Sequence, residues 1–466
     1  MNKTKISRRL FLTGSAASMA AAGCATAKVR KTTLAKSGYR SPNEKLNIAS
    51  IGVGGKGRSD VETCNTENIV ALCDVDWRNA ANAFKSYPKA KQYKDFRRML
   101  DECKEIDAVT ISTPDHMHAI AAMRCMEAGK HVYVQKPLTH TVFEARVLRQ
   151  TARKYGVATQ MGNQGAATDL HREVCEMVWA GLIGPVREVH SWTDRPQGWW
   201  PQGIPGPLAK EPIPDYLQWD LWLGPAPVRP YNSGYCPFKW RGWWDFGCGA
   251  LGDIACHNLS PVAKALQLEY PISVECVHRK DGNEQTYPNE SILHYRFPER
   301  KGFCALDLFW YDGLLKPPLP AGTTEAMNLF EEKTGTLFVG DGGVIVMNGQ
   351  RGKNILAANG EIVSDYEKPR MIIPRLPNIS SKSRDERQDS DRMHKLDWIL
   401  SCKTGSVSGT NFDHAGPLTE WVVMGNISLK FPKQVLEWDG PNMRFTNCKE
   451  ANRYVSKKYR KGWELV

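Results

Sequence analysis

The sequence predicts an α/β fold: a doubly wound parallel sheet near the N-terminus, followed by an α+β part with a mostly antiparallel open sheet. Before residue 162, short apolar runs alternate with helical patterns, and this alternation specifies a parallel sheet with right-handed crossovers. After residue 163, several strand-like runs follow one another with turn residues between them, as antiparallel strands do. With 466 residues the chain is also too long for one ordinary core, so we expect two domains.

The first domain is expected over residues 45–162. Its predicted strands are the apolar runs Leu46–Val53, Ile69–Val75, Ala108–Thr113, His131–Gln135 and Val157–Met161. The segments Ala119–Ala128 and Phe143–Lys154 are rich in helix formers and lack internal proline, so they are predicted to be helices between these strands.

The second domain is expected over residues 163–466. A predicted helix at Asp169–Ala180 leads into a strand at Val186–Thr193, and a long stretch rich in Trp, Pro and Gly follows up to residue 249. Further strands are predicted at Ile272–His278, Ser291–Phe297, Phe303–Tyr311, Thr336–Val339 and Val344–Met347. Helices at Arg392–Cys402 and Leu418–Lys430 would close this domain.

The N-terminus has the features of an export signal. Four basic residues precede a short apolar run that ends at Ala22, which is too short to span a bilayer but suits a secretory signal. Ser7-Arg8-Arg9-Leu10-Phe11-Leu12 is typical of twin-arginine signals, and the segment that ends at Cys24 resembles a lipobox. We therefore expect a signal peptide over residues 1–24, a lipid anchor at Cys24, a linker over 25–44, and a periplasmic or envelope-associated location. The alternative is a disordered tail with a chance arginine pair.

The composition argues against several classes of protein. The net charge is +12 at pH 7, but the basic residues are spread along the chain and form no block interleaved with aromatic residues, so we expect no nucleic-acid binding. The thirteen cysteines include no Cys-x-x-Cys pair, and no zinc site has the required ligand spacing. We therefore expect no bound metal.

A glycine-rich motif, Gly52-Val53-Gly54-Gly55-Lys56-Gly57, directly follows the first predicted strand and precedes a helix. In this setting glycines permit a tight turn, close approach of a pyrophosphate to the backbone, and close packing of helix on strand. Asp74, at the end of the second strand, can bond the adenosine ribose and would repel a 2′-phosphate. The motif therefore predicts a Rossmann domain that binds NAD, with NADP less favoured because only Arg78 supports it.

Three further segments have the character of family motifs. They are Ser112-Thr113-Pro114-Asp115-His116-Met117-His118, the run Ala128–Pro137 that ends in Val-Gln-Lys-Pro, and Gly252-Asp253-Ile254-Ala255-Cys256-His257. With the glycine motif, they make nearly the whole chain after Leu46 resemble the glucose–fructose oxidoreductase/inositol dehydrogenase (Gfo/Idh/MocA) family. The family's usual Glu-Lys-Pro stands here as Gln135-Lys136-Pro137, and this departure leaves the orientation of Lys136 open.

The resemblance implies that Lys136 lies beside the nicotinamide and the reacting carbon. A lysine at the C-terminal end of a parallel strand also projects into the crevice where such sheets bind ligands. The resemblance makes Asp253 and His257 the pair that meets Lys136 across the cleft, and their spacing places both on one face of a helix. It implies that His257 is the general base and that Asp253 orients substrate or base. An isolated Asp/His pair of this spacing is otherwise most often a polar pair on a helix surface.

Other residues around the expected cleft are candidates for ligand contacts. The expected additional contacts with the cofactor are Thr113, Pro114, His118 and Asn163. His116 and His118 form a His-x-His pair, but no third ligand lies nearby, so capping or contact with a ribose is preferred over a metal site.

Tryptophans are concentrated in the stretch ahead of Asp253. They are Trp192, Trp199, Trp200, Trp219, Trp222, Trp240, Trp243 and Trp244. Most are expected to pack the loops, since Trp fills a large volume with little loss of entropy, and one or two to line a sugar pocket. Arg241 and Trp243 are expected to contact the substrate, and Asp194 and Arg195 could bind its hydroxyls or carboxylates.

The leading hypothesis is NAD-dependent oxidation of a secondary alcohol on a sugar, polyol or glycoside by hydride transfer. Because free NAD is not expected outside the cytoplasm, the cofactor would stay tightly bound. One alternative is an NAD-dependent glycoside hydrolase or lyase that oxidises the sugar transiently without net cofactor turnover. Another is a non-catalytic sugar-binding lipoprotein, which only Gln135 supports. Family analogy implies a homo-oligomer, a dimer or tetramer, formed through the open sheet.

Overall fold

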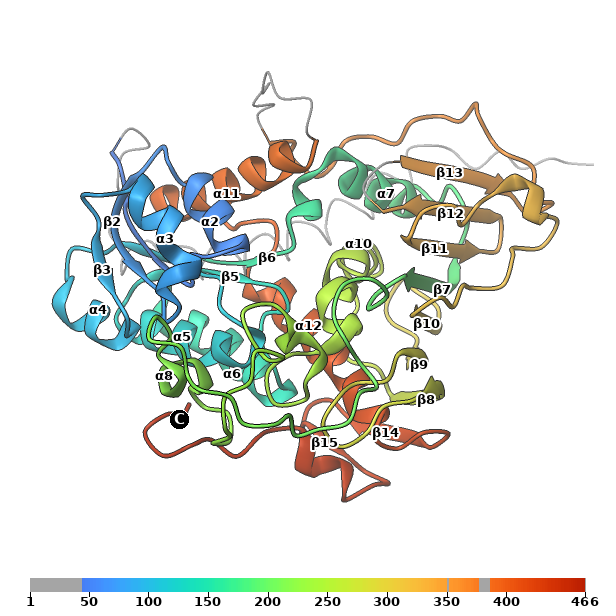
Figure 1. Ribbon diagram of the computed structural model, residues 1–466. Helices are drawn as coiled ribbons and strands as arrows, with labels where there is room; N and C mark the ends of the chain where they lie inside the picture. Colours follow the sequence, from blue (N-terminus) through green and yellow to red (C-terminus); the bar gives the residue numbers. More distant parts are fainter. Residues whose placement is uncertain (1–43, 350–351, 377–385, 466) are drawn as a thin grey trace, which may run out of the picture.

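The computed structural model describes residues 44–349, 352–376 and 386–465 (Figure 1). The expected signal peptide, the expected anchor at Cys24 and nearly all of the expected linker lie outside these residues. Within the described part, none of the helices combines the length and the apolar character that a membrane span requires.

The N-terminal sheet has six parallel strands in the order β3-β2-β1-β4-β5-β6, which confirms the predicted doubly wound architecture. Its strands are β1 (Asn47–Ile51), β2 (Asn68–Cys73), β3 (Lys91–Tyr93), β4 (Ala108–Ile111), β5 (His131–Gln135) and β6 (Thr159–Gly162). The prediction missed β3, because an edge strand of three polar or half-buried residues has no apolar run.

Helices connect these strands in the manner of a doubly wound sheet (Figure 1). They are α2 (Lys56–Glu62), α3 (Trp77–Ser86), α4 (Phe96–Glu102), α5 (Asp115–Glu127) and α6 (Val142–Tyr155). The α6 helix has strong local signals at both ends. The Thr141 and Glu144 side chains bond each other's backbone amides as a capping box, and Gly156 ends the helix in the left-handed conformation.

The second sheet has nine strands in the order β13-β12-β11-β7-β10-β9-β8-β14-β15. They are β7 (Val186–Thr193), β8 (Ser273–Lys280), β9 (Glu290–Phe297), β10 (Leu306–Asp312), β11 (Thr334–Gly340), β12 (Gly343–Asn348), β13 (Gly352–Ala357), β14 (Val435–Asp439) and β15 (Arg444–Phe445). Among the strands that the structure describes, only the β7–β10 pair of this sheet is parallel, so the expectation of a mostly antiparallel sheet is confirmed.

Helices α7 (Asp169–Trp179), α10 (Ser260–Ala265) and α12 (Phe412–Ser428) lie between the two sheets (Figure 1). Trp421 of α12 packs edge-on against Tyr295 and Phe297 of β9, and α12 also contacts α6. Short helices α8 (Trp219–Leu223) and α9 (Cys256–Asn258) lie in the Trp-rich part and directly after it. The core is therefore continuous from one sheet to the other.

Helix α11 (Glu386–Thr404), which was expected in the second domain, packs against the N-terminal sheet. Its Trp398, Ile399 and Cys402 pack with Leu46, just before β1, and with Tyr133 of β5 (Figure 1). This position could not be predicted from the sequence, because the apolar residues of a helix do not identify the surface that they cover. The N-terminal sheet is thus completed by a helix that lies more than 200 residues further along the chain.

Candidate functional site

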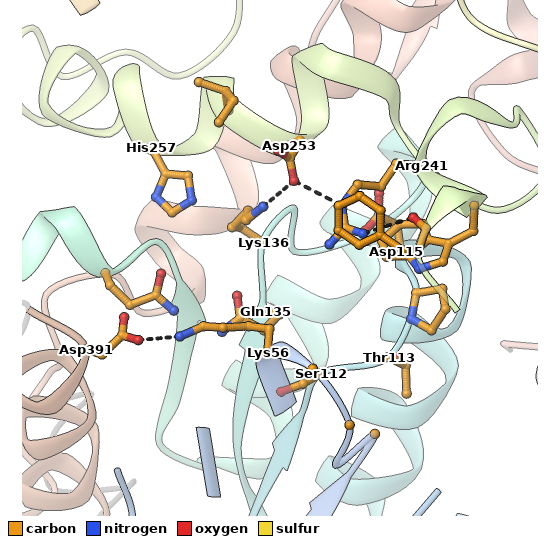
Figure 2. Close-up of a pocket in the computed structure, with 18 of the residues that line it drawn as sticks. Lys56, Ser112, Thr113, Asp115, Gln135, Lys136, Arg241, Asp253, His257 and Asp391 are labelled. Atoms are coloured by element: carbon orange, nitrogen blue, oxygen red, sulfur yellow. Dashed lines mark hydrogen bonds and ion pairs between the residues drawn. The ribbon is translucent and has the colours of Figure 1, made fainter. Parts of the chain in front are cut away.

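A cavity of about 1510 Å³ lies at the carboxyl ends of the parallel strands, between them and the Trp-rich segment. This is where doubly wound sheets bind their ligands. Figure 2 shows side chains from both parts of the chain converging on it. The predicted residues that line it are Gly52, Gly54, Gly55, Asp74, Thr113, Pro114, Lys136, Arg241, Asp253 and His257.

The glycine motif forms a turn that only glycine fits. Gly52 has φ +76°, and a Cβ atom there would lie 2.8 Å from the Ser112 carbonyl oxygen. A Cβ at Gly57 would lie 1.8 Å from the Gly52 carbonyl oxygen, so Gly57 allows the close packing of α2 on the turn although it does not line the cavity. Gly54 and Gly55 present their backbone to the cavity. The turn therefore fits the pyrophosphate of a dinucleotide.

Asp74 lies at the end of β2 and is bonded to the glycine turn. Its Oδ2 accepts hydrogen bonds from the amides of Val53 (2.7 Å) and Gly54 (3.2 Å), and its Oδ1 accepts one from the amide of Asp76 (2.9 Å). Burial raises the pKa of Asp74 to about 6, although these amides oppose the shift. Arg78 does not line the cavity, because its guanidinium lies over the Tyr216 ring.

Lys136 ends β5 and is the centre of the candidate site. The Lys136–Pro137 peptide bond is cis. The Lys136 Nζ donates to Asp253 Oδ1 at 2.6 Å, and Arg241 Nε approaches the same oxygen at 3.3 Å (Figure 2). Burial opposes the charge of Asp253, but Lys136 and Arg241 hold its pKa below the ordinary value. Asp253 is therefore a carboxylate shared by two cations.

Asp253 and His257 come from one helical segment, as the spacing predicted, but its first part is a wider π-helical turn over Leu251–Ala255. Such turns are frequent at functional sites. His257 also lines the cavity, and Figure 2 shows its ring extending from this segment beside Lys136. The structure thus brings together the three residues that the resemblance named.

Besides Gly57, three expected ligand residues do not line the cavity. Trp243 is fully buried and its Nε1 donates to the Gly234 carbonyl, so it packs the Trp-rich segment instead of contacting a substrate. Asn163 is also fully buried, and its amide donates to the Cys256 carbonyl.

The third, His118, lies behind the cavity wall between the carbonyls of Pro137 (2.8 Å) and Thr113 (2.9 Å). Burial lowers the pKa of His118 to about 4, so the ring is neutral and donates to one carbonyl only. His118 therefore links two segments that line the cavity and does not itself line it.

The structure adds Asp115, which the sequence did not single out, and places two of the named candidates, Trp199 and Arg195, at the cavity. Asp115 begins α5, accepts a hydrogen bond from the Cys248 amide at 3.0 Å and lines the cavity; burial raises its pKa to about 7. The sequence did contain a signal for Asp115, because this residue lies inside the Ser112–His118 motif. Trp199 lines the cavity with 48% of its surface exposed, and Arg195 lies 3.2 Å above its ring. Within the described residues no group of His, Cys, Asp and Glu could hold a metal ion.

Two domain descriptions of one family match successive parts of this chain. Residues 46–163 match the oxidoreductase family, NAD-binding Rossmann fold (GFO_IDH_MocA), and residues 190–295 match the C-terminal alpha/beta domain of the same oxidoreductase family (GFO_IDH_MocA_C2). Both of these parts of the chain therefore match domains of the Gfo/Idh/MocA family. The cofactor of its N-terminal domain is NAD.

Individual relatives cover a smaller share of the chain. An alpha-N-acetylgalactosaminidase of Shewanella oneidensis is 33% identical over 38% of this chain and 44% of its own length. An inositol 2-dehydrogenase 2 of Saccharopolyspora erythraea is 30% identical over 31% of this chain and 44% of its own. These alignments span less than half of either relative.

Among solved structures, an inositol dehydrogenase homolog from Azotobacter vinelandii, complexed with NADH and myo-inositol, is similar over 85% of this chain and 98% of its own. Its TM-score is 0.60 at 13% sequence identity, so it shows the shared fold.

Proposed function

We propose that the protein oxidises a secondary alcohol of a sugar, polyol or glycoside by hydride transfer to NAD. The observation that carries the proposal is the Lys136–Asp253 pair beside His257, in the cavity that the glycine turn opens. A neighbour of the same fold holds NADH and myo-inositol together, which supports a polyol or sugar as substrate. NAD supplies the hydride acceptor.

The residues of the chain would handle the proton and the orientation. His257 would take the proton of the substrate hydroxyl, and NAD would accept the hydride from the carbon that carries this hydroxyl. Lys136, oriented by its contact with Asp253, would donate a hydrogen bond to the reacting oxygen. Arg241 shares the Asp253 carboxylate and restricts its rotation. Trp199, exposed in the cavity, offers a flat face to the substrate.

The test is absorbance at 340 nm with NAD and a panel of sugars, polyols and glycosides. We expect net reduced cofactor with at least one member of the panel. Lys136→Ala should retain NAD binding, measured by calorimetry, and lose turnover. Undiminished turnover in this variant would refute the role of Lys136.

A second candidate is redox-neutral cleavage of a glycoside, and the similarity to the alpha-N-acetylgalactosaminidase of Shewanella oneidensis favours it. In this case the sugar is oxidised transiently and the hydride returns, so the aglycone leaves without net reduction of NAD. Chromogenic glycosides separate the two: aglycone release at constant absorbance at 340 nm supports cleavage, and accumulation of NADH supports the dehydrogenase.

We further propose that the protein is exported with NAD tightly bound, is anchored through Cys24 and forms a dimer or tetramer. The twin-arginine and lipobox-like segments support export and anchoring, and family analogy supports the oligomer. Cell fractionation, mass spectrometry of the purified protein for lipid and NAD, and light scattering test these points one by one. A soluble cytoplasmic monomer free of NAD would contradict all of them.

A further inference from the structure

A buried carboxylate lies behind the reaction centre. The side chain of Asp60, on α2, is 1% exposed and accepts three hydrogen bonds of 2.7 Å. The donors are the Ser112 hydroxyl, the Gln135 amide and the Lys395 ammonium group. Burial opposes the charge of Asp60, but Lys395 and Lys56 hold its pKa below the ordinary value. Asp60 is therefore a fixed anion.

The three donors come from three different parts of the chain. Ser112 follows β4, Gln135 is the last residue of β5, and Lys395 lies on α11. The Lys395 ammonium group is itself 1% exposed and lies 3.2 Å from the centre of the Tyr133 ring. Asp60 thus joins α2, two strand ends and α11 at one buried point.

Each of these connections leads to the cavity. Gln135 immediately precedes Lys136, and Ser112 immediately precedes Thr113, which lines the cavity. A second contact on the same side joins α11 to the glycine motif, since Lys56 pairs with Asp391 (Figure 2). The Asp60 carboxylate holds the Gln135 side chain, and Gln135 is the backbone neighbour of Lys136. Asp60 therefore also restricts the position of the backbone that carries the Lys136 side chain.

The charge at this point explains why residue 135 is a glutamine. An amide can donate to the Asp60 carboxylate, whereas a glutamate there would place a second anion against it and donate nothing. The space is also tight, because a Cβ at Gly162 would lie 2.8 Å from the Gln135 amide carbon. Residue 135 therefore has room for its amide in one place only.

We propose that Asp60, Gln135 and Lys395 are positioning residues: the Asp60 carboxylate, neutralised by Lys395 of α11, fixes the end of β5 through the Gln135 amide and so sets the position of Lys136. The effect of this network on the reaction rests on the proposed function. The network itself requires only that positions 60 and 135 together carry one carboxylate and one amide.

The experiment exchanges the two groups. Gln135→Glu alone places two anions together, Asp60→Asn alone leaves Lys395 without an anion, and the double variant restores one of each. We expect kcat at saturating NAD and substrate to fall by about 10- to 100-fold in each single variant, because small displacements of a reacting group have effects of this size. We expect the double variant to recover kcat to within about fivefold of the wild type, a recovery that a purely steric role would not produce.

Two controls separate positioning from stability. Lys403 on the same helix pairs with Glu67, and both side chains are buried far from the cavity. Lys403→Met should lower the melting temperature but leave kcat unchanged. Gln92→Glu, on the exposed edge strand β3, should change neither. If Gln135→Glu alters only the melting temperature, or if the double variant is no better than the singles, the positioning role is overturned.

The proposal can be judged even if the wild type oxidises no alcohol in the panel. The same four proteins then give a double-mutant cycle in NAD affinity and in thermal unfolding without ligand. If positions 60 and 135 are coupled both in NAD affinity and in thermal stability, the positioning network is supported even though the proposed reaction is not. Additive effects overturn the network whatever the reaction is.

Discussion

The Asp253 carboxylate offers the most direct test of the candidate site. Its Oδ1 receives Lys136 at 2.6 Å and Arg241 at 3.3 Å, and the Asp253 and Lys136 side chains are 10% and 16% exposed. Opposite charges 2.6 Å apart attract by about 6 kcal/mol at an effective dielectric constant of about 20. The cost of desolvation offsets part of this attraction, and removing one partner of a buried pair costs about 3–5 kcal/mol. Because both groups retain some contact with the cavity, Asp253→Asn should lower the free energy of unfolding by about 3 kcal/mol.

The measurement is urea unfolding of the protein at pH 7, followed by Trp fluorescence. A matched control is Asp307→Asn, because Asp307 also contacts two basic side chains, His294 and Arg296, but its own side chain is 51% exposed. This control should lose less than about 1 kcal/mol. In the same variants, Asp253→Asn should lower kcat/KM by at least about 100-fold, since Lys136 loses the group that fixes it. An unfolding free energy for Asp253→Asn within about 1 kcal/mol of the wild type would refute the reasoning.

Four further substitutions test other parts of the structure. Gly57→Ala puts a Cβ 1.8 Å from the Gly52 carbonyl oxygen, so the turn must shift; calorimetry should show at least about tenfold weaker NAD binding, and unchanged affinity would contradict the fit. Burial raises the pKa of Asp312 to about 7, so the folded protein keeps a proton that the unfolded chain releases above about pH 4, and stability should fall as pH rises from 4 to 7. Asp312→Asn should flatten this part of the profile in thermal unfolding between pH 5 and 8, and an identical slope would show that another group is responsible. Trp199→Ala should raise KM at unchanged kcat in steady-state kinetics, because Trp199 is exposed in the cavity. Trp243→Ala should lower the free energy of unfolding in urea by about 3–5 kcal/mol, because Trp243 is buried in a packed cluster. A large loss of stability in Trp199→Ala with a changed KM in Trp243→Ala would contradict this assignment.

The features that the sequence predicted are those in which neighbouring residues carry the whole signal. The glycine motif lies between a strand and a helix, and Asp74 ends the next strand, so the turn and the acid could be located without tertiary information. Strands β7 to β12 of the second domain were predicted within a few residues because they contain recognisable apolar runs, whereas β13, β14 and β15 were not predicted. Asp253 and His257 were found by resemblance to the family, because their spacing alone fits many helix surfaces.

Residues whose role depends on burial were harder to assign. Trp243 and Trp199 lie in the same Trp-rich stretch and have equal affinity for a sugar face by their chemistry. One is fully buried in a cluster of aromatic side chains, and the other is half exposed in the cavity. Only the packing of the intervening loops decides between them, and loops rich in Pro and Gly carry no periodicity from which packing could be inferred.

Gln135 shows most clearly why the sequence could not complete the site. Beside Lys136 it resembles the loss of a functional acid, and this was the only support for a non-catalytic protein. In the fold its amide meets Asp60, which is 75 residues away in sequence, and Asp60 meets Lys395, which is 335 residues away. A carboxylate is still present beside residue 135, because the Asp60 side chain lies against the Gln135 amide. Lys136 is then held by Asp253 through its side chain and by this network through its backbone, and both constraints require the C-terminal half of the chain. A reaction centre completed by the last quarter of the sequence forms only in the folded protein, which is the state that the proposed twin-arginine route would export.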